Sequence, residues 1–494
     1  MDFRQFVKEL KEEGYIVEVS KEVDPNLEVG AIIRRVYETG APAPLFSNLI
    51  GRKGDGLFRI LGAPLGVSKI QGRELGRVAR SLGLESTASA KQIISKINEA
   101  KEKPPVPCVE VENGPIKENK IVGDEIDLNE LPVPFQHEDD GGKYIQTFGM
   151  FAVQSPDGKW TNWSITRAMV HDKRHLVGPI IPKQDIGTIF ELWKQKGEDM
   201  PYALCFGVPP AAIMVGGMPI PKWTNEPDFI GALTGKGVDV VKCESNNLLI
   251  PANSEIVLEG VASISETGKE GPMAEYHGMI FPGESRQCPL FRVDSVSYRN
   301  DPILPLCVAG RAPEENHTVW SLMQAAEVLN ICQHHDLPIK MVWCPFESHC
   351  LWFAFQVDRA KLAKLQTTPE EFCRKLGHVV FGSKPGWYIP KIFLVGEDVD
   401  PSNLNDVIWA EATRCEPGKS EFVFTEYSSI PLIPYVSYGF SKDKSTSGKV
   451  VKCCMLPVEF TESPLPWKVG SFQGNYPQSL QKRVLENWSA YGFK

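Results

Sequence analysis

Helix-like and strand-like patterns alternate at both ends of this chain, whereas short β-rich runs fill its middle, and this order constrains the fold most. Residues 1–105 alternate the two patterns and end in a charged, proline-rich stretch that is typical of a linker. From residue 106 to residue 312, β-rich runs are separated by Gly, Pro and Asn turns, and from residue 313 to residue 494 helices and strands alternate again. We therefore predict an α/β (α+β) fold with three domains, 1–105, 106–312 and 313–494.

Two helices are predicted from the signals at their ends. Asp185 begins a run with apolar residues at helical spacing, and Gly197 follows where a C-terminal cap would lie. Thr368 is followed by Pro and then by Glu371, which together form a capping-box pattern. We expect this second helix to end at Gly377.

Charge and cysteine usage narrow the functional classes. A formal net charge of -9 argues against a surface that wraps nucleic acid, and no apolar, uncharged stretch is long enough to span a bilayer. Asp2 already begins a helical pattern, which leaves no room for a signal peptide. The 12 cysteines show no framework spacing, so we expect reduced thiols. These features predict a cytoplasmic protein that binds neither nucleic acid nor a membrane.

Polar side chains recur over residues 162–167, where a packed β-rich domain would not normally place them. In an extended strand, Asn162, Ser164 and Thr166 share one face, and Arg167 lies on the other. Asn, Ser and Arg close together could hold a phosphate or a carboxylate. Residue types alone favour a simpler interpretation, an edge strand with a solvated polar face.

Acidic residues stand out in two further stretches. Residues 266–278 have the Gly and Pro content of a loop and present Glu270 and Glu275. Two acids near an Arg can have different proton affinities, as acid–base catalysis requires, although a solvated acidic turn would look the same. Glu226 precedes an apolar run, where a helix cap is favoured over a surface charge or a metal ligand.

Two motifs are rejected. Residues 231–237 resemble a phosphate loop, but the glycine spacing is too short and Gly237 replaces the magnesium-binding hydroxyl, so we expect a glycine-rich turn. A second group lacks regular zinc spacing and is interpreted as core cysteines and helix-surface histidines. It comprises Cys332, His334, His335, Cys344, His349 and Cys350.

Longer motifs, spread over nearly the whole chain, carry a family resemblance. The chain resembles the UbiD-like decarboxylases, most closely the ferulic and cinnamic acid decarboxylase branch. This resemblance implies a central split-barrel flavin-binding domain and a C-terminal α/β dimerisation domain. The motifs lie at residues 23–31, 141–144, 159–165, 203–212, 218–221, 270–272 and 275–278.

The resemblance implies prenylated FMN as cofactor, with Mn2+ (or Mg2+) and K+. The family's catalytic Arg and two Glu correspond to Arg167, Glu270 and Glu275. The metal ligands correspond to Asn162, Glu226 and Asp185, the last in place of a His, and an Asp oxygen suits Mn2+ or Mg2+. The implied cofactor-binding residues are Asn162, Trp163, Ser164, Ile165, Arg167, Gln184, Asp185, Glu226 and Lys384.

The implied reaction is a cycloaddition of the substrate double bond to the prenylated flavin, followed by loss of CO2. Arg167 would orient the carboxylate, Glu270 would hold Arg167, and Glu275 would deliver a proton. The implied pocket is more polar than a phenylacrylate requires, so we predict a hydroxylated aromatic or nitrogen heteroaromatic acid rather than plain cinnamate. Its residues are Ile181, Tyr276, Asn316, Trp320, Ile430 and Leu432.

The resemblance also implies a homodimer and a separate flavin prenyltransferase that supplies the cofactor. Two alternatives stay open. The chain could run in the carboxylating direction, or it could be a non-catalytic flavin-binding or assembly subunit on the same fold. The presence of Arg167, Glu270 and Glu275 counts against the second alternative.

Overall fold

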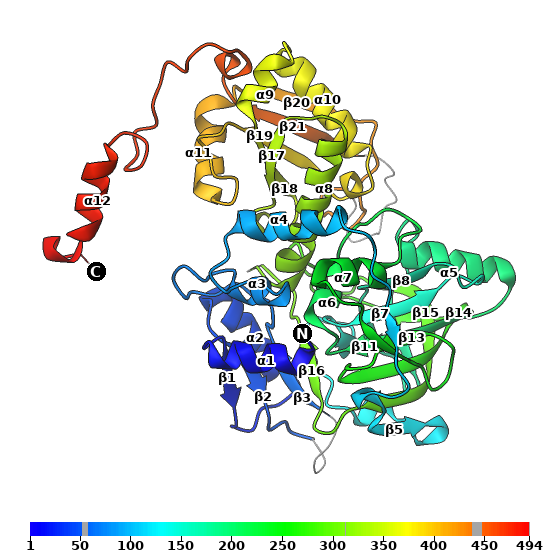
Figure 1. Cartoon of the computed structure of the whole chain (residues 1–494). Helices are drawn as coiled ribbons and strands as arrows, with labels where there is room; N and C mark the ends of the chain where they lie inside the picture. Colours follow the sequence, from blue (N-terminus) through cyan, green and yellow to red (C-terminus); the bar gives the residue numbers. More distant parts are fainter. Residues whose placement is uncertain (52–57, 312, 437–446, 494) are drawn as a thin grey trace.

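In the part of the chain that the structure describes, four β-sheets and the helices around them make up the fold (Figure 1). The computed structural model describes residues 1–51, 58–311, 313–436 and 447–493. The mixture of helices and strands confirms the predicted α/β (α+β) class. No helix in these ranges is long and apolar enough to cross a membrane.

The N-terminal sheet has the strand order β1-β2-β3-β16, so its last strand comes from a distant part of the chain. The helical pattern expected from Asp2 onward is present, and Asp2 caps this first helix, because its side chain accepts a hydrogen bond of 2.8 Å from the Gln5 N–H. β16 (Ile303–Leu306) lies parallel to β3. The other elements are α1 (Phe3–Glu12), β1 (Ile16–Val19), α2 (Glu28–Thr39), β2 (Ala43–Phe46), β3 (Arg59–Gly62), α3 (Gly76–Ser81) and α4 (Ala90–Lys101).

The central region is built on a nine-stranded sheet with the order β6-β9-β10-β15-β14-β11-β7-β8, in which β5 also pairs with β15. Its long hairpin of β14 (Ile256–Glu270) and β15 (Arg286–Tyr298) ends where Glu270 pairs with Arg286. The remaining strands are β5 (Asn119–Val122), β6 (Tyr144–Gln146), β7 (Met150–Gln154), β8 (Thr161–Ser164), β9 (Ala168–Val170), β10 (His175–Val177) and β11 (Met200–Phe206).

Three helices and a small sheet flank this central sheet. Helix α5 runs from Asp185 to Lys196 and ends at Gly197, whose φ of 77° is left-handed, as the sequence predicted. The other elements are α6 (Pro210–Gly216), α7 (Glu226–Thr234) and a three-stranded sheet of β4 (Val109–Glu110), β12 (Asp239–Lys242) and β13 (Leu249–Pro251).

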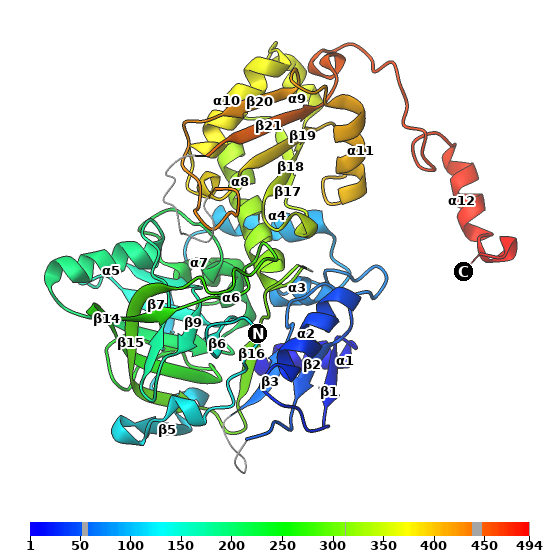
Figure 2. The ribbon, with the colours of Figure 1, turned by 180° about the vertical axis from the view of Figure 1, so that it is seen from behind.

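The C-terminal sheet has the order β17-β18-β19-β21-β20, and α4, which lies below this sheet in Figure 1, packs against both α7 and α8. Figure 2 shows α12 standing clear of the rest of the molecule. The elements are η4 (Asn316–Ser321, a π-helix), α8 (Leu322–His334), β17 (Ile339–Trp343), η5 (Phe346–Ser348), β18 (Trp352–Val357), α9 (Arg359–Lys364), α10 (Pro369–Phe381), β19 (Lys391–Val395), α11 (Leu404–Arg414), β20 (Glu421–Phe424), β21 (Lys449–Cys454) and α12 (Gln478–Glu486).

Three local predictions need correction. Helix α10 has the predicted capping box but continues past Gly377, because this glycine lies in the core against Phe424, where a Cβ would come within 2.3 Å of the ring. Residues 231–237 are mostly the end of α7, and only Gly235 forms the turn. Glu270 lies in β14 rather than in a loop, because its pairing with Arg286 extends the strand.

All twelve cysteines are unpaired, and all but Cys108 and Cys415 are buried. This finding agrees with the expectation of reduced thiols. The interpretation of the rejected zinc motif holds for the core residues Cys332, Cys344 and Cys350 and for the exposed His334 and His335. It is wrong for His349, which is half-buried after a short 3-10 helix because its ring hydrogen-bonds to the Tyr276 carbonyl.

Candidate active site

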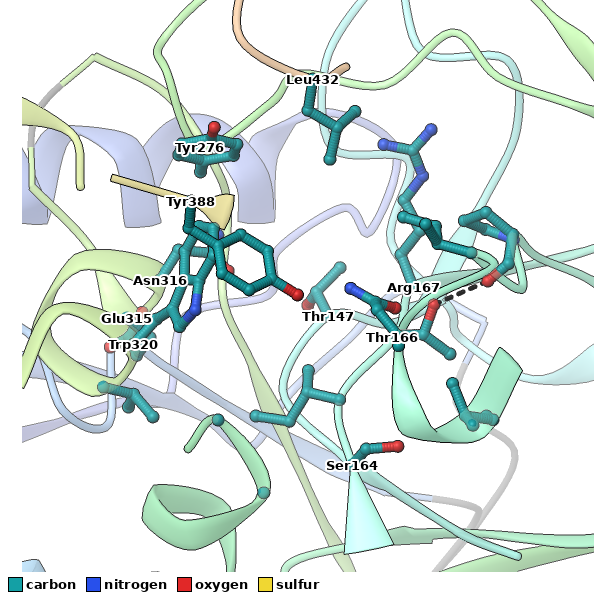
Figure 3. Close-up of a pocket in the computed structure, with 18 of the residues that line it drawn as sticks. Thr147, Ser164, Thr166, Arg167, Tyr276, Glu315, Asn316, Trp320, Tyr388 and Leu432 are labelled. Atoms are coloured by element: carbon teal, nitrogen blue, oxygen red, sulfur yellow. Dashed lines mark hydrogen bonds between the residues drawn. The ribbon is translucent and has the colours of Figure 1, made fainter. Parts of the chain in front are cut away.

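One cavity brings most of the predicted site residues together. Its walls come from β8 and the bend after it, from the starts of α5 and α7, from η4 and from C-terminal loops. Figure 3 shows Arg167 and Thr166 across the cavity from Asn316 and Trp320. The predicted residues that line it are Asn162, Ser164, Ile165, Arg167, Ile181, Gln184, Asp185, Glu226, Glu275, Tyr276, Asn316, Trp320, Lys384, Ile430 and Leu432.

Two predicted residues lie behind the cavity wall. The Trp163 side chain is buried in the core, and this residue reaches the site only through its backbone N–H, which donates to Glu226 Oε2 at 3.1 Å. Glu270 is fully buried and contacts the cavity through Arg167.

Arg167 is held between two carboxylates. Its Nε and Nη2 donate to the two oxygens of Glu270 at 2.8 and 3.1 Å, and its Nη1 pairs with Glu275. Tyr144 donates its hydroxyl hydrogen bond to Glu270 at 2.7 Å. Burial raises the pKa of Glu270, but the positive charge and hydrogen bonds of Arg167 outweigh burial and hold this pKa below its usual range. Glu270 is therefore a fixed anion that orients Arg167.

The strand that carries the polar stretch is an edge strand, as residue types suggested, but its polar face is not solvated. β8 ends the sheet order, yet Asn162 is only 1% exposed because α7 covers this face. The Asn162 amide donates to Glu226 Oε1 at 2.9 Å, and Ser164 donates to Asn162 Oδ1 at 2.8 Å. The covering helix thus turns an ordinary edge strand into one wall of a site.

Glu226 is the first residue of α7, and it is buried rather than a surface cap. Burial raises its pKa to about 8, and the nearby negative charge of Asp185 adds to this rise. The backbone N–H groups around it and the Asn162 amide lower the pKa only in part. A buried carboxylate in this state is one that a cation would stabilise.

Asp185 lies beside Glu226, at the start of α5, and is only partly satisfied. Lys384 donates to its Oδ2 at 2.6 Å and to the Ile220 carbonyl at 2.5 Å. Its Oδ1 is buried and has no hydrogen-bond partner among the described residues. The side-chain atoms with which Asn162, Asp185 and Glu226 can bind a cation are all oxygens. Such a set of ligands fits Mn2+ or Mg2+.

An aromatic wall closes the opposite side of the cavity. The Trp320 ring packs edge-on against Tyr276, with centroids 5.2 Å apart, and against Tyr388, with centroids 4.9 Å apart. Figure 3 shows the Tyr388 hydroxyl pointing toward Thr147. Asn316 lies on the same wall, where its amide nitrogen donates to Glu314 Oε1 at 3.1 Å.

Comparison with known proteins settles the family. The N-terminal, Rift-related and C-terminal domains of 3-octaprenyl-4-hydroxybenzoate carboxy-lyase match residues 7–97, 108–312 and 317–454. The chain belongs to the UbiD family. This membership confirms the resemblance inferred from the sequence motifs and identifies the chain as a carboxy-lyase.

Two UbiD relatives align over the whole chain. A pyrrole-2-carboxylic acid decarboxylase of Pseudomonas aeruginosa is 43% identical over 493 residues, which cover 100% of this chain and 98% of that protein. Ferulic acid decarboxylase 1 of Saccharomyces cerevisiae is 43% identical over 498 residues, covering 100% and 99%. Among solved structures, the UbiD-class enzyme HmfF from Pelotomaculum thermopropionicum, in complex with FMN, has the same fold, with a TM-score of 0.82, 23% identity and coverage of 99% and 100%.

Several residues that line the cavity were not predicted from the sequence. Tyr388 lies four residues after Lys384, and one helical turn places both residues at the cavity. This spacing could have predicted Tyr388 from the sequence once Lys384 was assigned to the site. Burial raises the pKa of Tyr388 to about 12, and the Gln184 side chain lowers this pKa only in part. Arg286 and Glu315 also line the cavity, but no local pattern distinguishes them from surface charges.

Proposed function

We propose that this UbiD family chain uses prenylated FMN to decarboxylate an aromatic, heteroaromatic or α,β-unsaturated acid, and that the reaction is reversible and non-oxidative. The observation that carries this proposal is Arg167, which is fixed by Glu270 from behind and paired with Glu275 at the cavity. A cation held this way can bind a carboxylate next to a group that can donate a proton.

Each member of this group has a distinct role in the proposed reaction. Arg167 orients the substrate carboxylate, while Glu270 stays ionised and keeps the guanidinium in place. The substrate carboxylate competes with Glu275 for Arg167 Nη1, which frees Glu275 to carry a proton. The prenylated flavin, when bound, supplies the electron sink for loss of CO2. Glu275 then protonates the carbon that CO2 has left.

The opposite end of the cavity suits the rest of the cofactor. Lys384 offers a positive charge for a phosphate, and Ser164 and Gln184 offer hydrogen bonds. Trp163 and Ile165 complete the proposed cofactor-binding stretch. Asn162, Asp185 and Glu226 would hold Mn2+ or Mg2+ in place of the Lys384 contact to Asp185. We include K+ in the proposed cofactor set because the family resemblance of the sequence implies it.

The aromatic wall supports a substrate with a polar ring. Because the Asn316 amide nitrogen is turned to Glu314, its amide oxygen is the atom available to accept from a ring N–H or O–H. Tyr276 and Trp320 form the flat faces beside it, and Ile181, Ile430 and Leu432 complete the pocket. Pyrrole-2-carboxylic acid, on which one relative acts, carries such an N–H.

Assembly as a homodimer is also proposed. No residue of α12 is buried, and Leu485, Trp488, Tyr491 and Phe493 on and after it are exposed. A projecting arm with this many apolar side chains would be covered by a second copy of the chain. We further propose that the protein works in the cytoplasm, where its unpaired cysteines stay reduced, and takes its cofactor from a flavin prenyltransferase.

The test is to co-express the chain with a flavin prenyltransferase, supply Mn2+ and K+, and measure CO2 release from a panel of acids. We expect bound prenylated FMN and release from pyrrole-, indole- or hydroxybenzoate-type acids. The Asn316→Leu variant should lose about 10-fold or more in kcat/KM for these acids, because the acceptor is gone. Turnover of cinnamate alone would contradict the polar-ring proposal, and bound cofactor without any CO2 release would favour the non-catalytic subunit.

A further inference from the structure

The backbone carbonyl of Tyr276 accepts hydrogen bonds from two imidazole rings. His317 Nε2 and His349 Nδ1 each lie 2.7 Å from this oxygen, and the two rings pack edge-on with centroids 4.6 Å apart. A carbonyl oxygen can only accept, so both ring nitrogens must carry a hydrogen. Tyr276 directly follows Glu275, and its carbonyl belongs to the peptide bond between Tyr276 and His277, so both histidines hold the turn one residue beyond the proposed proton donor.

The surrounding hydrogen bonds set the two tautomers. The N–H of Glu314 donates to His317 Nδ1 at 2.9 Å, which leaves the ring hydrogen of a neutral His317 on Nε2. Burial lowers the pKa of His317 to about 3, in keeping with a neutral ring. His349 must instead carry its hydrogen on Nδ1, the opposite arrangement.

The turn that bears Glu275 is closed by its own backbone, and Asp140 anchors the start of the turn, because its Oδ1 accepts a hydrogen bond of 3.2 Å from the Ala274 N–H. The Glu275 N–H donates to the Met279 carbonyl at 3.0 Å, and the Gly278 N–H donates to the Glu275 carbonyl at 2.9 Å. Rotation of the Tyr276 peptide would move the Glu275 side chain relative to Arg167. The two imidazoles oppose this rotation from outside the turn.

Both imidazoles come from the C-terminal part of the chain. His317 belongs to η4, which also supplies Asn316 and Trp320 to the substrate wall, and His349 follows η5. The Tyr276 carbonyl belongs to the central region. The hydrogen bonds therefore join the substrate wall to the turn of the proton donor, across the boundary between two family domains.

We propose that His317 and His349 are positioning residues that hold Glu275 at Arg167 through the Tyr276 carbonyl. The role rests on the proposed decarboxylase function, in which Glu275 transfers the proton. Neither imidazole transfers a proton in the reaction. Losing either donor lets the turn move, which slows proton delivery more than it weakens substrate binding.

The kinetic test compares two substitutions of His349, whose φ of 53° is left-handed. Asn and Gly both tolerate this conformation, but only the Asn side-chain amide can donate to the Tyr276 carbonyl. We expect His349→Gly to lower kcat about 10- to 100-fold with KM changed less than about threefold, and to raise the solvent deuterium isotope effect on kcat. His349→Asn should keep at least about a third of kcat. The exposed control His334→Ala should match the unsubstituted enzyme.

Equal kcat for the Gly and Asn variants would overturn the proposal, and so would a loss confined to KM. A second measurement needs no turnover: 15N spectra of histidine-labelled protein should show His349 with its hydrogen on Nδ1 and His317 with its hydrogen on Nε2. A His349 hydrogen on Nε2 alone would overturn the proposal whatever the protein catalyses. Absence of CO2 release from unsubstituted protein bears on the decarboxylase function and leaves this spectroscopic test intact.

Discussion

Two pairs of acids lie at the same cavity, each with one fully buried member, Glu270 or Glu226, and they differ in how their charge is compensated. Glu270 and Glu275 share Arg167, and the pKa of Glu270 falls below its usual range because this cation is fully engaged. Glu226 and Asp185 share no arginine, and burial raises the pKa of Glu226 to about 8. Lys384 reaches only one oxygen of Asp185.

The difference teaches that residue type does not set the state of a buried acid. At the end of the cavity formed by Arg167, Glu270 and Glu275, the arginine end, the protein itself compensates the acidic charge. These side chains can therefore serve in successive rounds of a reaction without an added ion. The Asp185–Glu226 end has more negative charge than its protein partners compensate, so it suits a divalent cation from solution. Three predictions test this contrast.

The largest effect is expected at the arginine end, from the substitution Glu275→Gln. Glutamine keeps the size of the side chain but cannot release a proton to carbon, so kcat should fall about 10²- to 10⁴-fold. Steady-state CO2 release measures this loss. The exposed Glu266→Gln, in the same hairpin, is the matched control and should keep full activity. A Glu275→Gln enzyme with unchanged kcat would show that another group delivers the proton.

The second prediction compares the stability cost of losing one acid at each end. Glu270→Gln leaves the half-buried guanidinium of Arg167 with a weaker set of partners, and should lower the free energy of unfolding by about 3 kcal/mol. In metal-free protein, Glu226→Gln should change it by less than about 1 kcal/mol, because the amide resembles the protonated acid. Urea unfolding at pH 7 measures both. Equal costs would mean that the two ends do not differ in charge compensation.

The smallest effect is a pH dependence of stability at the Asp185–Glu226 end. The pKa of Glu226 is about 8 in the fold, and it returns to about 4.3 when the chain unfolds, so the folded state binds the proton more tightly. Metal-free protein should therefore lose stability as the pH rises between these two values, and Glu226→Gln should flatten the slope. Mn2+ binding near pH 7 should release a proton, measurable by calorimetry in buffers of different ionisation enthalpy. Binding without proton release would contradict the raised pKa.

Local sequence signals predicted the helices well where a cap decided the boundary. The Thr368 capping box and the Gly197 terminus act within one turn of the chain, so sequence alone suffices for them. The predicted helix end at Gly377 was wrong, because this glycine has a helical conformation. A glycine is needed there because the residue packs against Phe424. The two predicted boundaries between the three domains stay predictions, although β16 joins the N-terminal sheet across the first of them.

The site could be assembled from the sequence only through long motifs. Residue types alone favoured a solvated strand at Asn162 and a cap at Glu226, because nothing local shows that α7 covers β8. The family resemblance that these motifs carry predicted fifteen residues that line one cavity, and no spacing rule connects them. They did not indicate Arg286, which reaches the site through cross-strand pairing with Glu270. Their catalytic and binding roles stay predictions.

The position of β16 in the N-terminal sheet bears on how the chain is made. Gly62 of β3 pairs with Leu306, so the ribosome must add more than half of the chain before this edge of the sheet is covered. Until then β3 offers unpaired backbone groups to any other extended segment. Of the paired strands, β3 is therefore separated from its partner by the longest stretch of chain still to be synthesised. We expect the N-terminal region to be the part most prone to misassociation during synthesis.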